Sequence, residues 1–329
     1  LYFGAAMGLY PNRHVADAAF CVVRGGVQTS VFRSQRAPID RADATRLGEI
    51  QVEVVEPLKV LRVLVDAPEQ GLRADLTFEY RSPAIEEAHF FQRTGIRAFF
   101  DYTRLTQFGN WHGWIELDGE RIVVDRDDVW GSRDRSWGVR PIGEPAPSGA
   151  PIPFAQFFWL WAPTNFPSLS THFDVNEFGD GKRWHETGTI VRPGQEPHMM
   201  RTVEWRVQWR PGTRFADSFE YDLIDWDGSV STVKMRPRYE FHMRGIGYGN
   251  PEFGHGYWKG ESVTGGERLQ LPVANPLARE HVHVQALCDA ELHLPDGTVE
   301  HGMGILEQLA IGPHPSGLTG ILDGYSPNP

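Results

Sequence analysis

The stretch EIQVEVVEPLKVLRVLVD, residues 49–66, alternates apolar and polar side chains over much of its length. Side chains of a β-strand point to opposite faces with a period of two, so this pattern predicts strands rather than a helix. The same alternation recurs in LRADLTFEY (72–80), WHGWIELDG (111–119), RTVEWRVQW (201–209) and EHVHVQALCDAELHLPDG (280–297). Only PAIEEAHFFQR (83–93) indicates a helical turn or two. The sequence therefore predicts an all-β fold.

Turn signals between these segments support the same fold class. Glycine and aspartate tolerate the positive φ that tight hairpin turns require. Four dipeptides fit such turns: Gly25-Gly26, Asp118-Gly119, Asp227-Gly228 and Asp296-Gly297.

The length of 329 residues predicts two domains. The proline- and glycine-rich segment RPIGEPAPSGAPIP (140–153) is the expected boundary, between an N-terminal domain over 1–143 and a C-terminal domain over 144–329. A similar series of strands runs on each side. We therefore expect two antiparallel β-barrels or sandwiches side by side, with a ligand cavity in or between them.

The net charge, the apolar runs and the cysteines indicate which classes of function are not expected. The net charge of −11, without any run of lysine or arginine, argues against a nucleic-acid surface. No apolar run approaches the roughly 18 residues of a membrane helix. Cys21 and Cys288 are the only cysteines, and we interpret them as free thiols in a reducing cytoplasm. The oligomeric state is not indicated.

The segment VWGSRDRSWGVR (129–140) is the most informative one for function. Asp134 stands between Arg133 and Arg135, whose charges would favour its ionised form. In a structural interpretation, Asp134 and Arg140 form a salt-bridge clasp, Trp137 plugs a barrel end and Gly138 permits a corner. In a functional interpretation, Asp134 is a general acid or base, and Trp130 and Trp137 shape the substrate pocket.

The longer stretch QFGNWHGWIELDGERIVVDRDDVWGSRDRSWGVR (107–140) resembles the signature of the lipocalin-like hydroxyneurosporene-synthase superfamily. This superfamily includes carotenoid hydratases, tocopherol-cyclase-like proteins and fungal intramolecular Diels–Alderases. The matching residues are Gly113, Asp118, Gly119, Arg133, Asp134, Ser136, Trp137, Gly138 and Arg140. Weaker similarity extends to VEVVEPLKVLRV near the front and to HGMGILEQL, which contains Glu307.

This resemblance implies a pair of lipocalin-like β-barrels and a hydratase, dehydratase, isomerase or cyclase activity. Arg135 occupies a position where the family more often has histidine, so any acid–base chemistry that uses that imidazole would differ here. The resemblance also places the aromatic segment after the motif near the cavity.

That aromatic segment, PFAQFFWLWAPTNFPSLSTHFDVNEF (153–178), predicts a wall for a flat or polyene-like ligand. On a strand, Phe157, Trp159 and Trp161 would share one face. Ordinary core packing explains these aromatic residues equally well. Asn165 and His172 could polarise a substrate oxygen, although a structural hydrogen bond is the favoured interpretation of each. The glycine-rich run 244–260 is interpreted as a mobile connection, and its Tyr257 and Trp258 as parts of a lid that contacts the substrate.

Other chemistries have little support. His281 and His283 share a strand face in the predicted strand 280–297, but no third ligand is obvious, so no metal site is expected. The sequence has no G-x-S-x-G nucleophile motif and no phosphate-binding loop, and we expect no cofactor. We therefore predict a cofactor-independent enzyme for an isoprenoid, steroid or polyketide substrate. The alternative is a non-catalytic carrier of lipid-like molecules.

Overall fold

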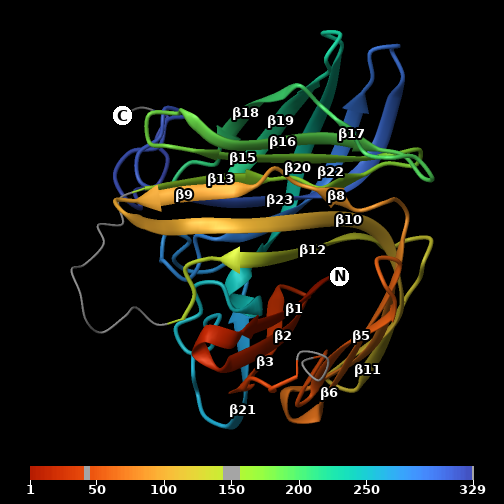
Figure 1. Cartoon of the computed structure of the whole chain (residues 1–329), viewed down its shortest axis with the longest axis vertical. Helices are drawn as coiled ribbons and strands as arrows, with labels where there is room; N and C mark the ends of the chain where they lie inside the picture. Colours follow the sequence, from red (N-terminus) through yellow and green to blue (C-terminus); the bar gives the residue numbers. More distant parts are fainter. Residues whose placement is uncertain (41–44, 144–155, 328–329) are drawn as a thin grey trace.

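The computed structural model describes residues 1–40, 45–143 and 156–327, without the side chain of Thr94. The described residues form three antiparallel sheets, as Figure 1 shows. The described helical segments are the short 3-10 turns η1 (Pro11–Arg13), η3 (Pro68–Gln70) and η4 (Met243–Ile246). None of the described helices is long and apolar enough to cross a membrane. The all-β prediction is confirmed.

The N-terminal half contributes most of two sheets. The first has the order β1-β2-β3-β21. Its strands are β1 (Tyr2–Tyr10), β2 (Val15–Arg24), β3 (Val27–Arg36) and β21 (Ser262–Gln270). The second follows β11-β10-β7-β6-β5-β4, and β8, β9 and β12 also pair with β10. Its strands are β4 (Arg46–Leu47), β5 (Ile50–Glu56), β6 (Val60–Ala67), β7 (Leu72–Tyr80), β8 (Ile85–Glu86), β9 (Phe90–Thr94), β10 (Arg97–Leu117), β11 (Glu120–Val124) and β12 (Trp130–Val139).

The third sheet belongs to the C-terminal half and follows β17-β16-β15-β13-β23-β22-β20-β19-β18, with β14 beside β15 and β23. Its strands are β13 (Phe157–Trp161), β14 (Thr164–Asn165), β15 (Ser170–Glu177), β16 (Arg183–Val191), β17 (His198–Met199), β18 (Thr202–Trp209), β19 (Ala216–Ile224), β20 (Val230–His242), β22 (Val284–His293) and β23 (Val299–Ile311). The sheet curls around an apolar core that includes Phe173, Tyr221 and Leu306.

The predicted strands and turns can be compared with this structure directly. Residues 49–66 form the hairpin of β5 and β6, and 72–80 form β7. Asp118 and Gly119 both have positive φ, 51° and 83°, in the tight turn between β10 and β11. The helical prediction for 83–93 is wrong, because Ile85 and Phe90 are buried on β8 and β9, which pair with β10.

The three sheets do not follow the division of the sequence into an N-terminal and a C-terminal half. β21 comes from the C-terminal half, yet it pairs with β3 in the first sheet. Residues 144–155, which contain most of the predicted domain boundary, lie outside the described residues. The 21-residue strand β10 runs along the third sheet, so side chains on one of its faces can reach the C-terminal half (Figure 1).

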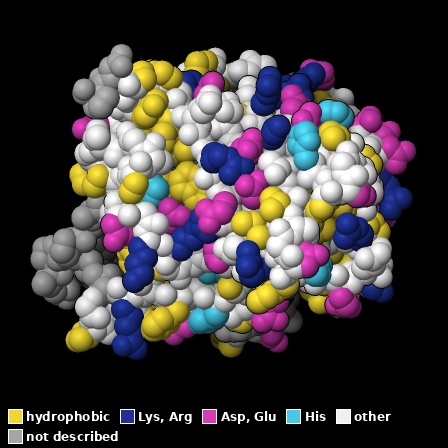
Figure 2. Space-filling view, turned by 90° about the horizontal axis from the view of Figure 1, so that it is seen from above, with side chains coloured by type: hydrophobic (Ala, Val, Ile, Leu, Met, Phe, Trp, Pro, Cys, Tyr) yellow, Lys and Arg dark blue, Asp and Glu magenta, His cyan; other side chains and the backbone are white. Residues whose placement is uncertain are grey.

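Both cysteines are free and buried, as the sequence indicated. Burial raises the pKa of each thiol, which keeps the thiols protonated. Figure 2 shows acidic and basic side chains interspersed with apolar ones over the face seen from above.

Candidate functional site

The register of β12 on β10 separates the charged residues of the sequence motif. Asp134 lies opposite Thr106, and Ser136 lies opposite Arg104. Because side chains alternate along a strand, Asp134 and Ser136 share a face with Arg104, while Arg133 and Arg135 occupy the other face.

The other residues of the motif have surroundings separate from those of Asp134. The Nε and Nη2 groups of Arg133 donate to the Gln107 side-chain oxygen at 2.9 and 2.7 Å. Arg135 is exposed, and Trp137 is 54% exposed rather than enclosed as a plug. Gly138 has φ +139°, and a Cβ there would lie 2.3 Å from the Asp101 carbonyl oxygen. Glycine is therefore required at this corner.

The Asp134 carboxylate forms no hydrogen bond or ion pair with any residue in the described ranges. Asp134 is an exposed residue, yet the surrounding protein raises the pKa of its carboxyl above the ordinary value. Desolvation is the main cause, Arg104 opposes it, and Glu307 adds to it. The pKa of this carboxyl thus shifts opposite to the direction expected from the flanking arginines, because desolvation by the surrounding protein outweighs the charges of Arg104 and Arg140. Since water reaches the carboxyl, it can still exchange protons.

Arg140 follows β12 on the Asp134 side. Its guanidinium donates to the Ser136 hydroxyl at 2.9 Å and lies 5.1 Å from the centre of the Tyr102 ring. The Tyr248 hydroxyl lies beside it. Within the described part of the chain, Arg140 makes no ion pair, so the clasp between Asp134 and Arg140 is not formed.

A histidine–carboxylate pair approaches the same region from His283, just before β22, and from Glu307 on β23. Glu307 accepts from His283 Nε2 at 2.6 Å and from Gln285 Nε2 at 2.7 Å. The His283 ring lies 5.9 Å from the Trp159 ring and 5.2 Å from the Tyr248 ring, edge to face in both contacts. Glu307 also acts electrostatically on Asp134. We call Asp134, Arg140, Trp159, Tyr248, His283 and Glu307 the central cluster.

The His283–Glu307 pair was not predicted, although the sequence contained a signal for it. The turn at Asp296-Gly297 sets the register of β22 on β23, and this register places Gln285 opposite Glu307. The expected shared strand face of His281 and His283 is wrong, because β22 begins only at Val284. His281 instead contacts the Asn275 carbonyl and the Arg244 guanidinium.

Next to the central cluster, Arg104 joins the two halves through a buried ion cluster. It pairs with Glu87 and Asp174, and all three residues are almost fully buried. Trp159 Nε1 and His185 Nε2 also contact the Asp174 carboxylate, at 2.7 and 3.3 Å. Burial tends to raise the pKa of Asp174, but the charges of Arg104 and then His185 outweigh burial, so the pKa is lowered.

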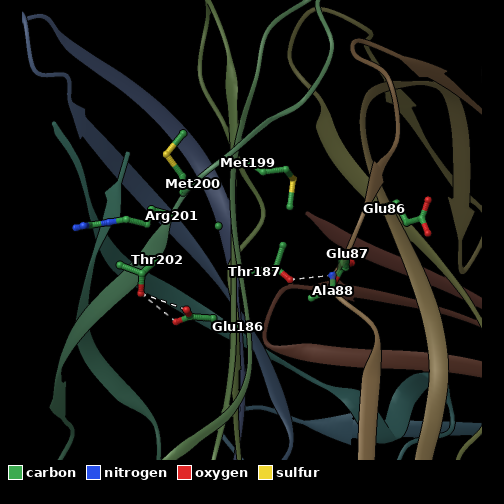
Figure 3. Close-up of a pocket in the computed structure, with 10 residues that line it drawn as sticks. Glu86, Glu87, Ala88, Glu186, Thr187, Met199, Met200, Arg201 and Thr202 are labelled. Atoms are coloured by element: carbon green, nitrogen blue, oxygen red, sulfur yellow. Dashed lines mark hydrogen bonds between the residues drawn. The ribbon is translucent and has the colours of Figure 1, made fainter. Parts of the chain in front are cut away.

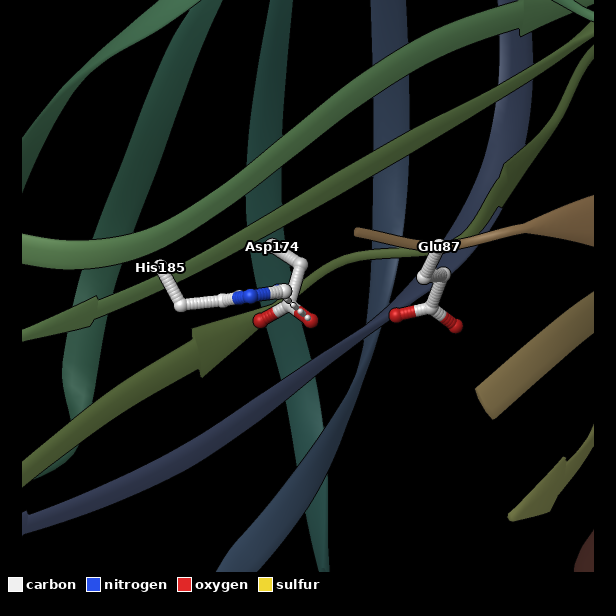
Figure 4. Close-up of side chains that lie close together, drawn as sticks. All are labelled: Glu87, Asp174 and His185. Carbon is white, nitrogen blue, oxygen red and sulfur yellow. Dashed lines mark hydrogen bonds and ion pairs between the residues drawn. The ribbon is translucent and has the colours of Figure 1, made fainter. Parts of the chain in front are cut away.

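Figure 4 shows Glu87, Asp174 and His185 converging from two sides. Their ligand atoms lie within 4.8 Å of one another, a geometry that can hold a metal ion. However, the Arg104 guanidinium already contacts both carboxylates. This arginine therefore supplies the positive charge that the two acids require.

Asn165 and His172, the two predicted polarising residues, are both buried at the interface between the halves. Asn165 Oδ1 accepts from Arg81 at 3.0 Å. His172 Nε2 accepts from Trp161 Nε1 at 3.0 Å, so the ring proton lies on Nδ1, a buried atom with no partner in the described residues. Burial lowers the pKa of His172, which keeps the ring neutral. Their role toward a substrate stays a prediction.

Among the predicted pocket aromatics, Trp159 belongs to the central cluster. Trp161 is buried beside His172, and Phe157 packs against Phe100 with ring centres 5.9 Å apart. Trp130 lies 4.7 Å from the Arg81 guanidinium.

The loop 247–261 lies over the first sheet. The Tyr257 carbonyl accepts from Ser34, and the 44% exposed Trp258 stacks with Arg36. A closing movement of this loop stays a prediction.

A separate cavity of about 430 Å³ lies between the segment Glu86–Ala88 and strands β16 to β18 (Figure 3). Glu186, Arg201 and Met199 are among its lining residues. The Thr187 hydroxyl accepts from the Ala88 amide, and both residues line this cavity. The Glu186 carboxylate is already bound by Arg183 and Thr202.

Comparison with known proteins places these observations in a family. The chain belongs to the Family of unknown function (DUF8625), whose sequence profile matches residues 1–319. No curated protein matches the chain in sequence. The structure is similar to kievitone hydratase from Nectria haematococca, with a TM-score of 0.52 and 10% identity over 91% of this chain and 84% of that one. A Nitrosomonas europaea protein provisionally named AttH gives a TM-score of 0.48 and 11% identity over 89% and 86% of the two chains. The similarity to the hydratase shows a shared fold.

Proposed function

We propose that this DUF8625 member is a cofactor-independent enzyme that adds water to, or removes it from, an apolar small molecule at the central cluster. The observation that carries the proposal is Asp134, a water-accessible carboxyl without a partner whose pKa is raised. A raised pKa increases the fraction of neutral carboxylic acid, which is the form that donates a proton. The fold shared with a hydratase supports the same reaction class.

Hydration requires a proton donor at one carbon and a base for the attacking water. In the proposed mechanism, Asp134 gives its proton to one carbon of a double bond. His283 then takes a proton from the water whose oxygen bonds to the other carbon. Glu307 holds His283 Nε2 at 2.6 Å and would stabilise the resulting imidazolium. Proton transfer from His283 to Asp134 through solvent restores both groups, and dehydration is the reverse sequence.

The apolar part of the substrate would contact aromatic rings near these groups. Trp159 and Tyr248 both touch His283, so a ring or polyene bound against them would lie next to the proposed base. Their π faces could also stabilise positive charge that develops on the protonated substrate. Isoprenoid, steroid and polyketide compounds have this character. Isomerisation or cyclisation would use the same first proton transfer.

The test is turnover in water labelled with the heavy oxygen isotope, with kievitone and a panel of isoprenoids, steroids and polyketides. A hydration product retains the label, and mass spectrometry detects it. We expect Asp134→Asn to lower kcat by about 10²- to 10⁴-fold, the usual contribution of general acid–base catalysis. Asp101→Asn is the matched control, because Asp101 is an exposed acid on the adjacent strand β10, paired with His89.

Full turnover by Asp134→Asn would exclude Asp134 as the proton donor. Tight binding of a panel compound without turnover by the wild type would instead identify a carrier.

A further inference from the structure

Arg140 carries a positive charge that no carboxylate neutralises within the described ranges. Its protein contacts are neutral groups: the Ser136 hydroxyl, the Tyr102 ring and the Tyr248 hydroxyl. The residue is only partly exposed. Removing a guanidinium from water without a counter-ion is unfavourable, so such an arginine indicates a site for an anion.

The neighbouring groups cannot serve as that anion. Burial raises the pKa values of Tyr102 and Tyr248, so both phenols remain neutral at neutral pH. Asp134 acts on Arg140 only as a weaker, longer-range charge and forms no ion pair with it. By contrast, Arg104 on the same face holds two carboxylates.

We propose that Arg140 and the Tyr248 hydroxyl bind an anionic oxygen of the ligand, and that the ligand is therefore an apolar, ring-containing organic acid: a carboxylate, an enolate or an acidic phenol. Arginine donates to such oxygens in a planar geometry, and a phenol hydroxyl adds a further donor. The Tyr248 ring touches His283, which in turn touches Trp159. A planar acid held at Arg140 would thus extend over the aromatic side of the central cluster. This inference deepens the proposed function and rests on it for the identity of the site.

The experiment compares two probes of the same shape, 2-naphthoate and its neutral amide 2-naphthamide, by isothermal titration calorimetry. Both probes present the same apolar ring, so their difference in affinity reports the charge. We expect the wild type to bind naphthoate about 10- to 100-fold more tightly, the range for hydrogen bonds to a charged group. Arg140→Gln should remove this preference, and Arg140→Lys should keep part of it.

Arg135→Gln is the control, because Arg135 is an exposed arginine on β12, the strand that Arg140 follows, but on the other face. It should retain the full preference for naphthoate. Equal affinity of the wild type for the two probes, absence of naphthoate binding, or an unchanged preference in Arg140→Gln would overturn the proposal. Arg140→Lys keeps the positive charge, which separates loss of the site from loss of the fold.

The binding experiment does not depend on turnover, so it distinguishes this inference from the proposed catalysis. Asp134→Asn should retain the preference for naphthoate. If it does so while also retaining turnover, the anion site stands and the catalytic role of Asp134 falls. If Arg140→Gln keeps the naphthoate preference while Asp134→Asn loses turnover, the anion site falls and the catalytic role stands.

Discussion

Arg104 and Arg140 lie on the same face of the β10–β12 pair, yet the charge of one has ion-pair partners and the charge of the other has none among the described residues. Arg104 is almost fully buried and holds the carboxylates of Glu87 and Asp174. Arg140 retains contact with water and has only hydroxyl and aromatic partners in the described residues. Arg104 thus marks a buried region whose charges are paired, and Arg140 marks a partly exposed region whose charge is unpaired among the described residues.

This difference assigns separate roles to the two regions. A buried charge is tolerated when its partners satisfy it, and such a cluster fixes how the surrounding elements pack. Arg104 lies on β10 of the second sheet, Glu87 follows β8 of that sheet, and Asp174 lies on β15 of the third, so their ion pairs connect the two halves. An unsatisfied charge that water reaches can exchange solvent for a ligand. The buried ion cluster around Arg104 therefore positions the partly exposed region around Arg140, which includes Asp134.

The sharpest test of this comparison removes each positive charge. Arg104→Met leaves Glu87 and Asp174 buried without their cation, and we expect the free energy of unfolding to fall by about 3–5 kcal/mol. Arg140→Met breaks no ion pair and loses a hydrogen bond, so a loss of about 1 kcal/mol is expected. Urea unfolding monitored by tryptophan fluorescence measures both values. Equal losses would contradict the division into two regions.

The strands of this protein could be predicted largely from the sequence, because the alternation and the turns are local signals. Residues 72–80 are an example, since the predicted segment is the strand β7 itself. The segment 83–93 failed because its strands are short and are fixed by pairing with β10 rather than by their own pattern. Glu87 lies in this segment, so the ion cluster was missed with it.

The sequence could predict only those residues of the site that lie close together in one motif. The motif identified Asp134 and Arg140, but not their different surroundings, because Tyr248 and Glu307 come from distant parts of the chain. Neighbours in sequence also gave a wrong expectation for the charge of Asp134, because Arg133 flanks it but contacts Gln107 on the opposite face. Alternation along β12 could have separated these two residues. No local pattern could have indicated that Arg104 reaches Asp174 on β15.

A smaller effect should appear in the pH dependence of the paired region. Burial opposes ionisation of Asp174, but Arg104 and His185 lower its pKa from 3.8 to about 2. Its contribution to stability is therefore present above about pH 4 and is lost as the pH falls toward about 2. The difference in free energy of unfolding between wild type and Asp174→Asn should shrink by about 2 kcal/mol over this range. Urea titrations at a series of pH values measure it, and a constant difference would show that Arg104 does not favour the ionised form.

Asp134 should show a pH dependence of the opposite sign and the smallest size. Its pKa is raised by desolvation, so below pH 3.8 the carboxyl is protonated in both the folded and the unfolded chain and has no effect. As the pH rises above 3.8, the unfolded chain ionises first, which favours unfolding until the folded carboxyl ionises as well. Asp134→Asn should therefore be slightly more stable than the wild type at neutral pH and equal to it in acid. Water reaches this carboxyl, so the gain should be well below the effect at Asp174. Thermal unfolding at neutral and acidic pH tests this expectation. A loss of stability at neutral pH would show that Asp134 is a structural partner, whereas a gain would be typical of a group kept for function at some cost to the fold.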